Sequence, residues 1–134
     1  MWRLKAYNLW KRKSLTMPGT IGVVRPITRT HTLFEGTVST TPTPSHKVYV
    51  GEYSECTVFV ENSQDVEVQL TFEVSPDGEN WFVLRSDEKT KVGPNSKKIF
   101  ALIDRIAYFR VTSKALAQPT RGQVVIKLTG STLM

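Results

Sequence analysis

Reactive and cross-linking side chains are scarce in this chain, which has one cysteine and two histidines among 134 residues. The single cysteine, Cys56, excludes an intrachain disulfide framework. It belongs to the apolar alternation Cys56, Val58, Val60, so we expect a buried thiol that behaves as a small hydrophobe. His31 and His46 lie at no metal-ligand spacing from each other or from Cys56. We expect both histidines in loops or at the surface, and no metal site.

The sequence also lacks an arrangement of residues that would support catalysis. General acid–base chemistry needs two titratable groups in one cleft, with their pKa values pushed apart. The nearest carboxylate pairs, at positions 77/79 and 87/88, fall in expected loops. No Gly-x-Ser-x-Gly motif is present, and the Gly-Pro-Asn-Ser-Lys-Lys sequence at 93–98 lacks the second glycine of a phosphate loop. We predict no catalytic residue and no cofactor, and therefore a protein that is not an enzyme.

Long hydrophobic runs are missing as well. No apolar stretch approaches the roughly 18 residues that a membrane-spanning helix requires. The opening residues 1–17 contain basic side chains but no continuous apolar core, which is unlike a secretory signal peptide. We expect no membrane span.

Acidic residues are absent from the first 34 positions, which hold seven basic residues. The remaining hundred positions hold eleven basic and twelve acidic residues, so the formal net charge of +6 comes from the N-terminal part. Such asymmetry is typical of a segment that meets an acidic partner. We predict a basic N-terminal arm over residues 1–34.

The rest of the chain alternates between apolar and polar residues with a period of two. From Val66 to Val74, five apolar residues occupy every second position. A strand places them all on one face, whereas a helix would scatter them around its axis. Shorter alternations of the same kind follow at 99–103, 107–111 and 124–128, each bounded by turn residues. The pattern predicts an all-β domain, an antiparallel β-sandwich or jelly roll.

The clearest local element is a hairpin from Phe72 to Leu84. Pro76 favours a turn, and Gly78 provides the positive φ that lets the second strand return. Trp81 is then placed to cover the hairpin or the open end of the sheets. The predicted core comprises apolar residues from all of these strands: Val58, Val60, Val68, Leu70, Phe72, Trp81, Val83, Ile99, Phe109, Val111, Val124, Ile126 and Leu128.

The chain is expected to divide into an arm, a connecting segment and a body. Residues 35–46 are rich in Thr and Pro, and their two prolines lack amide donors, which is typical of a linker or an edge segment. The β-sandwich is expected to occupy residues 47–134. Within the arm, Trp2, Leu4 and Ala6 alternate as in a strand, while Trp2, Ala6, Leu9 and Trp10 fall on one helical face. The sequence leaves the conformation of the arm open.

Basic and aromatic residues are interleaved in the arm, which makes it the candidate partner-binding site. Phosphate neutralisation with base stacking would suit nucleic acid, but basic arms also bind anionic membranes and acidic protein surfaces. We favour an acidic protein surface and keep nucleic acid as an alternative partner. The predicted binding residues are Trp2, Arg3, Lys5, Leu9, Trp10, Lys11, Arg12, Lys13, Arg25 and Arg29.

Three segments between Val68 and Gly130 occur together in a familiar order. They are Ser-Pro-Asp-Gly-Glu-Asn-Trp at 75–81, Ala-Tyr-Phe-Arg-Val at 107–111 and Gly-Gln-Val-Val-Ile-Lys-Leu at 122–128. In this respect the chain resembles jelly-roll modules of tailed-phage virion accessory proteins. The hairpin followed by the Arg-Val strand is also similar to part of discoidin-type β-sandwiches. The resemblance covers about half of the chain and leaves out the arm.

This resemblance implies a structural subunit located in the virion. It points to a capsid decoration (cement) protein that stabilises the shell through its arm, with the major capsid protein or another virion subunit of acidic surface as partner. A homo-oligomer is expected. The alternatives are a head–tail or tail accessory or adhesion protein whose β-sandwich binds carbohydrate, and a nucleic-acid-binding protein that uses the arm.

Overall fold

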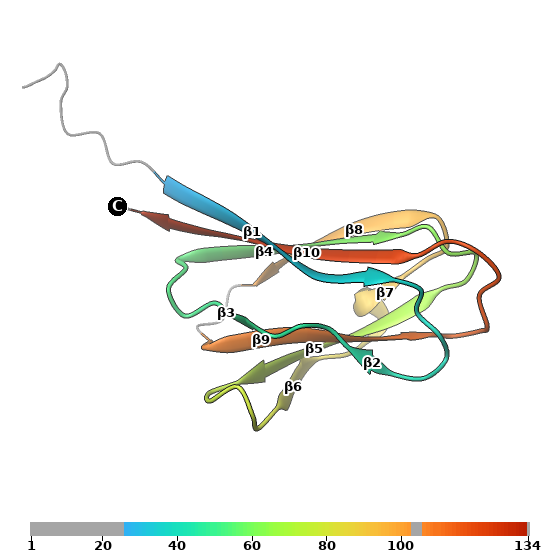
Figure 1. Cartoon of the computed structure of the whole chain (residues 1–134), viewed down its shortest axis with the longest axis horizontal. Helices are drawn as coiled ribbons and strands as arrows, with labels where there is room; N and C mark the ends of the chain where they lie inside the picture. The colour runs from blue at the N-terminus through green and yellow to red at the C-terminus, as the bar shows by residue number, and fades with distance from the viewer. Residues whose placement is uncertain (1–25, 103–105, 134) are drawn as a thin grey trace, which may run out of the picture.

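The computed structural model describes residues 26–102 and 106–133, and they form two antiparallel β-sheets packed face to face (Figure 1). The first sheet has the strand order β1-β10-β4-β8. Its strands are β1 (Pro26–Gly36), β10 (Val124–Leu133), β4 (Glu55–Asn62) and β8 (Ser96–Leu102). The all-β sandwich predicted from the alternation is confirmed.

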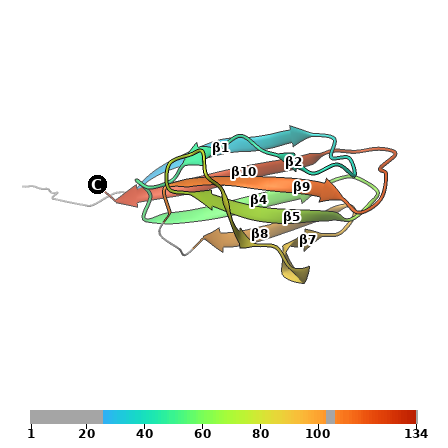
Figure 2. The same ribbon diagram turned by 90° about the horizontal axis from the view of Figure 1, so that it is seen from below.

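The second sheet is built around β5 (Val68–Ser75) and β9 (Tyr108–Ala115), which pair along their whole length. Two short strands, β2 (Thr43–Pro44) and β3 (Val48–Tyr49), extend it beyond β9. On the far side of β5 lie β6 (Phe82–Arg85) and β7 (Lys91–Val92), joined through the 3₁₀ turn η1 (Glu88–Thr90). Figure 2 shows that β1 and β2 run along one lateral side of the sandwich and β7 and β8 along the other.

The core lies between the two sheets and follows the predicted alternation in most strands. Ten of the thirteen predicted core residues are buried. Phe72 is central, because its ring packs edge-on against Phe100 at 4.9 Å between centroids and lies 5.6 Å from Phe109. Edge-to-face aromatic pairs add to the stabilisation from buried area. The half-buried Cys56 packs against this core, and burial raises the pKa of its thiol.

Three residues of the predicted core are not buried in the structure. Ile99 and Val83 are 68% and 64% exposed, and Trp81 is half-buried. In β8, Phe100 faces the core, so its neighbour Ile99 lies on the outer face opposite Phe59. Val83 belongs to the short edge strand β6, where an irregularity in pairing places it opposite Glu73. In both strands apolar residues stand at odd and even positions, so the period-two pattern did not identify the inner face.

The boundary of the predicted arm also differs from the structure. Residues 26–36 form β1, which pairs with β10 of the same chain over its full length. A bulge between Thr32 and Phe34 turns Leu33 into the core, where it is 1% exposed. The bulge breaks the alternation, so the strand was hidden in the sequence. Residues 26–34 therefore belong to the sandwich, and of the connecting segment 35–46, Thr43–Pro44 form the edge strand β2.

A buried polar turn, Asn62–Asp65, lies where β4 leaves the first sheet for β5. Gln64 is fully buried; its side chain accepts from the Val38 amide at 2.7 Å and donates to the Val38 carbonyl at 3.2 Å. The side-chain nitrogen of Asn62, Nδ2, donates to the backbone carbonyls of Val66, Val92 and Gly93 at 3.0–3.2 Å. These two side chains satisfy backbone groups that would otherwise be buried without a partner.

Replacing Phe72 with alanine should lower the free energy of unfolding by about 3–5 kcal/mol, because a large ring leaves the centre of the core. The matched control Ile99→Ala removes an equally apolar but exposed side chain and should change stability by less than about 0.5 kcal/mol. Urea unfolding of both variants measures the difference. A loss below about 1 kcal/mol for Phe72→Ala would contradict the central position of this ring.

Replacing Gln64 with leucine should cost about 2–4 kcal/mol although the volume is nearly kept, because the amide and carbonyl of Val38 lose their partner inside the protein. Gln123→Leu is the control, since its side chain is exposed, and it should be nearly neutral. The same unfolding experiment decides; equal losses in the two variants would argue against the Gln64 contact.

Candidate interaction site

The predicted arm residues are only partly covered by the described chain. Trp2, Arg3, Lys5, Leu9, Trp10, Lys11, Arg12, Lys13 and Arg25 all lie outside the described residues. Arg29 lies in β1, exposed, in the register position opposite Gly130. Of the two histidines, His46 is exposed in the segment between β2 and β3, whereas His31 is a half-buried residue of β1 and is hydrogen-bonded to the Tyr53 hydroxyl at 2.7 Å.

The turn of the β5–β6 hairpin is organised by one carboxylate. Asp77 accepts hydrogen bonds from the amides of Glu79 (2.8 Å) and Asn80 (2.9 Å) and from the Ser75 hydroxyl (2.9 Å). Gly78 follows with φ of +80° and donates its amide to Ser75 at 2.8 Å. The amides of Asn80 and Glu79 are the main cause that holds the pKa of Asp77 far below its usual range. The predicted proline–glycine turn is confirmed, with a carboxylate at its centre.

The outer face of the second sheet carries a cluster of paired charges beside Trp81. Arg110 donates to Glu73 across the β5–β9 pair at 2.7 Å, and the Thr112 hydroxyl donates to the same carboxylate oxygen at 2.7 Å. The guanidinium of Arg110 also lies over the Trp81 ring, 4.2 Å from its centroid, as a cation–π contact. The ring face of Trp81 beneath Arg110 is therefore occupied and is not a platform for a sugar.

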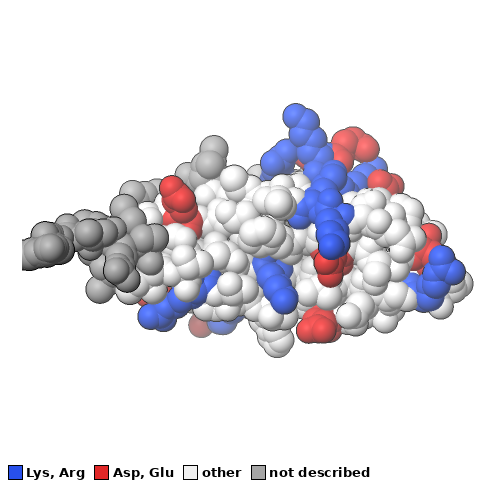
Figure 3. Space-filling model, turned by 90° about the horizontal axis from the view of Figure 1, so that it is seen from above, with Lys and Arg blue, Asp and Glu red and all other residues white. Residues whose placement is uncertain are grey.

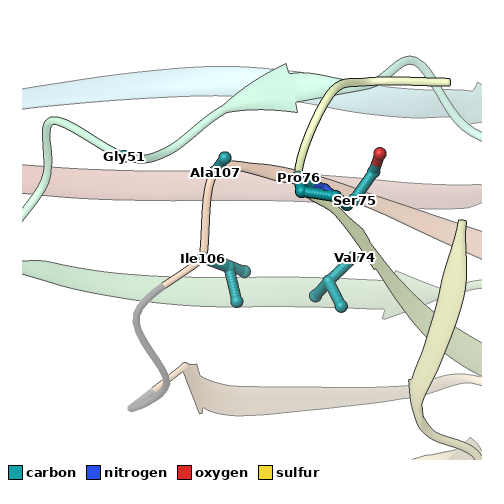
Figure 4. Close-up of a pocket in the computed structure, with 6 residues that line it drawn as sticks. All are labelled: Gly51, Val74, Ser75, Pro76, Ile106 and Ala107. Carbon is teal, nitrogen blue, oxygen red and sulfur yellow. The ribbon is translucent and has the colours of Figure 1, made fainter. Parts of the chain in front are cut away.

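A pocket of about 470 Å³ lies at the end of the sandwich next to this hairpin (Figure 4). It is lined by Gly51, Val74, Ser75, Pro76, Ile106 and Ala107. The Ser75 hydroxyl is its polar side-chain group, and this oxygen points away from Val74 and Ile106 in the close-up and is engaged by the turn. The pocket thus offers apolar walls without a free acid, base or nucleophile from the residues that line it.

Nearby, Tyr49 and Tyr108 form an edge-to-face pair with 5.3 Å between ring centroids, and Tyr49 is half exposed. Lys47 lies over the Tyr108 ring, 5.9 Å from its centroid, and donates to the Gly78 carbonyl at 3.1 Å, so it links this pair to the hairpin turn.

Within residues 26–102 and 106–133, no three His, Cys, Asp or Glu side chains come close enough to hold a metal ion. No helix of the described part is long and apolar enough to cross a membrane.

Strand β6 exposes three consecutive apolar side chains at the edge of the second sheet. Phe82, Val83 and Leu84 are 60%, 64% and 36% exposed. One side of β6 pairs with β5, and no other strand of the described chain pairs with the opposite side. Edge strands of stable monomers are normally shielded by charge, proline or a covering loop. The sequence placed Val83 in the core, because an apolar run such as Trp-Phe-Val-Leu before Arg85 does not distinguish a buried strand from an exposed edge.

The outer face of the first sheet carries charged side chains beside apolar ones, unlike the apolar edge of β6 (Figure 3). A groove of about 340 Å³ is formed there by Phe59, Ile99 and Val125, with Lys97 and Lys127 at its rim. Lys97 pairs with Glu61 at 3.1 Å. In Figure 3 basic and acidic groups are interspersed among neutral ones.

Comparison with known proteins places the chain in context. The model of the family described as a domain of unknown function, DUF6385, matches residues 49–130. None of the curated proteins matches the sequence. The fold is similar to that of YomS, a protein derived from the SPBc2 prophage, with a TM-score of 0.56 and 18% identity over 84% of this chain and all of that one.

A second similar structure is that of Bacillus endospore appendages, described as disulfide-linked pili. It superposes with a TM-score of 0.54 and 12% identity, over 83% of this chain and 92% of that one. At these identities the likeness concerns the fold. The same two-sheet sandwich is therefore found in a prophage-derived protein and in pili.

Lowering the pH below about 4 should remove a stabilising contribution of Asp77. A carboxylate whose folded pKa is depressed stabilises the folded state above the unfolded pKa of about 3.9, and this stabilisation is lost as the pH falls toward the folded pKa. Asp77→Asn should therefore flatten the fall in unfolding free energy between pH 4 and pH 2. Glu79→Gln, which removes a neighbouring exposed carboxylate, is the control; chemical unfolding at several pH values measures both, and parallel pH profiles of Asp77→Asn and wild type would contradict this role.

Proposed function

We propose that this chain, which belongs to the DUF6385 family, is a non-enzymatic structural subunit of a virus particle. The observation that carries the proposal is the segregation of charge around the described sandwich. Residues 1–25 hold six basic and no acidic residues, whereas residues 35–134 hold eleven basic and twelve acidic ones. A near-neutral body with a basic extension is built to be held by another macromolecule.

The fold supports a structural role in a second way. The pocket at the end of the sandwich is lined by apolar groups, and its hydroxyl is committed to the hairpin turn. The similar structures come from a prophage-derived protein and from pili. We place this chain on the capsid, as a decoration protein, with a head–tail or tail accessory position as the alternative within the same class.

The segment 1–25 is proposed to attach the sandwich to another subunit of the particle with an acidic surface. Its basic side chains would repel one another if they were packed together, and an acidic partner offsets that repulsion. Its aromatic residues supply the apolar contact, since Trp and Arg are the residue types most enriched at interface hot spots. Arg29 is not part of this attachment, because it lies within β1.

The direct test is to look for the chain in virus particles. Particles purified from cells that encode it should contain the full chain by mass spectrometry in a fixed ratio to the major capsid protein, and antibodies should label it on intact particles. Absence of the chain from purified particles, with the chain present in the cell lysate, would refute the proposed function.

Replacing Trp10 with alanine should weaken assembly more than replacing Lys13 with alanine. Exposed ion pairs contribute only about 0–1 kcal/mol each, whereas a buried aromatic anchor contributes more. Co-sedimentation of each full-length variant with particles measures the bound fraction. Raising the salt concentration should slow association without abolishing binding; a steep fall in affinity with salt would instead indicate a segment that follows nucleic-acid phosphates.

A further inference from the structure

The open edge of β6 is the most unusual feature of the described surface. Natural edge strands avoid consecutive exposed apolar residues, because an unpaired apolar edge is a template for another strand. Here Phe82, Val83 and Leu84 present apolar groups on both faces of the edge. The other open edge on this lateral side, β8, carries Lys97 and Lys98. On the opposite side, Pro44 stands in β2, where it removes an amide donor.

The charge around β6 indicates the sign of its partner. Arg85 pairs with Asp87 at 3.3 Å, and Glu88 pairs with Lys91 at 2.6 Å. The hairpin tip retains Asp77 and Glu79, for which no salt bridge is formed within the described residues. Lys47, which donates to the Gly78 carbonyl, offsets one of these two charges, and the remaining negative charge at the tip favours an incoming strand that is basic.

A second copy of β6 is not the basic strand that this edge favours. An antiparallel pairing of β6 with itself about Val83 and Leu84 would set Glu79 of each copy opposite Glu88 of the other, and of these two carboxylates only Glu88 has an ion-pair partner, Lys91, within the described chain. Juxtaposed charges of the same sign oppose such a pairing. The edge is therefore better suited to a segment of different composition.

The N-terminal segment of the chain has that composition. Residues 2–7, Trp-Arg-Leu-Lys-Ala-Tyr, alternate between apolar and basic side chains over its first five positions and contain no acid. In a strand, Trp2, Leu4 and Ala6 share one face, and Arg3 and Lys5 share the other. Six residues in a strand span about 20 Å, which is sufficient to cover the four-residue β6 and reach the acidic tip.

The positions of β1 and β6 favour a second copy over the same chain, because within one chain residues 8–25 would have to wrap around the sandwich to bring residues 2–7 to β6. The described chain starts with β1, at one end of the strand order of its sheet, while β6 is at the opposite end of the strand order of the other sheet. Strands β6 and β7 pair with the same side of β5, one after the other. Figure 2 shows β7 on the lateral side opposite to β1. A segment that precedes β1 on one side of a subunit and an acceptor edge on the other side would produce head-to-tail association.

We propose that residues 2–7 of one copy add as a strand to the open edge of β6 in the next copy. This inference rests on the structural role proposed above, and it assigns an acceptor to residues 2–7 of the basic segment. The main chain of residues 2–7 would complete the hydrogen bonds of the β6 edge, as in other cases of strand addition. Trp2 and Leu4 would lie beside the apolar side chains of β6, and Arg3 and Lys5 would approach the acidic hairpin tip.

A photo-crosslinking experiment on the full chain tests the contact. Leu4 is replaced by benzoylphenylalanine, and this protein is mixed with ¹⁵N-labelled wild type before irradiation. We expect crosslinked peptides that join the N-terminus of one isotopic form to residues 81–86 of the other. Crosslinks within one chain only, crosslinks to another surface, or the absence of a crosslinked dimer would each overturn the proposal.

A pair of charge variants provides the second arm of the test. Val83→Lys places a positive charge at the acceptor edge, and Ile99→Lys places the same charge at a site of matched exposure on β8, 68% against 64%. Sedimentation velocity should show self-association weakened at least about tenfold in Val83→Lys and unchanged in Ile99→Lys. Equal effects would overturn the proposal, and unchanged thermal unfolding of both variants confirms that the fold is intact.

The test of strand addition and the test of the virion assignment can fail independently of each other. Self-association through β6 of a chain that is absent from virus particles would refute the virion assignment and leave the strand addition standing. A chain present in particles whose self-association is insensitive to Val83→Lys would do the reverse.

Discussion

The structure depends on the buried hydrogen bonds of the turn Asn62–Asp65. Four connections cross between the two sheets at this end of the sandwich, and the turn contacts the other three. Gln64 holds the β1–β2 connection at Val38, and Asn62 holds the β7–β8 connection at Val92 and Gly93. The β9–β10 connection is held by Ser63, whose hydroxyl donates to the Gln123 carbonyl at 3.0 Å, and by Asp65, which accepts from Thr120.

The close approach of these connections explains one glycine. Gly122 has φ of +87°, and a Cβ atom at this position would collide with the Ser63 carbonyl. A side chain is therefore excluded both by the left-handed backbone and by the neighbouring turn. Several polar groups of this end, those of Asn62, Ser63, Gln64 and Asp65, are thus used in holding the sheets together.

The sequence predicted the fold where its pattern was long and unambiguous. Val68, Leu70 and Phe72 alternate strictly with polar residues, so only one face of β5 could be buried. In β8, Lys98–Phe100–Leu102 and Ile99–Ala101 are both compatible with an inner face, and only pairing with β4 selects between them. The role of Gln64 was not predicted, because its partner Val38 is 26 residues away along the chain.

The candidate site was predicted less completely, for a related reason. Net charge identified a basic segment, but charge carries no information on where a strand begins, so residues 26–34 were assigned to the arm instead of to β1. Apolar character likewise does not reveal whether a strand is central or at an edge. Val83 has the composition of a core residue, and only the strand order shows that it lies at an open edge.

The two properties that set this chain apart, a basic extension and an apolar edge, have complementary physical roles. Attraction between charges acts over about 8–10 Å in physiological salt and mainly raises the rate of encounter. Buried apolar contact and main-chain hydrogen bonds act at contact distance and mainly slow dissociation. Pro44 removes an amide donor from the edge strand β2, and Lys97 and Lys98 place charge on the edge strand β8. The same protection of β6 would take only one charged residue in place of Val83. The absence of that protection costs solubility in a free monomer and is therefore best understood as a property of a subunit whose β6 edge is covered in its assembled state.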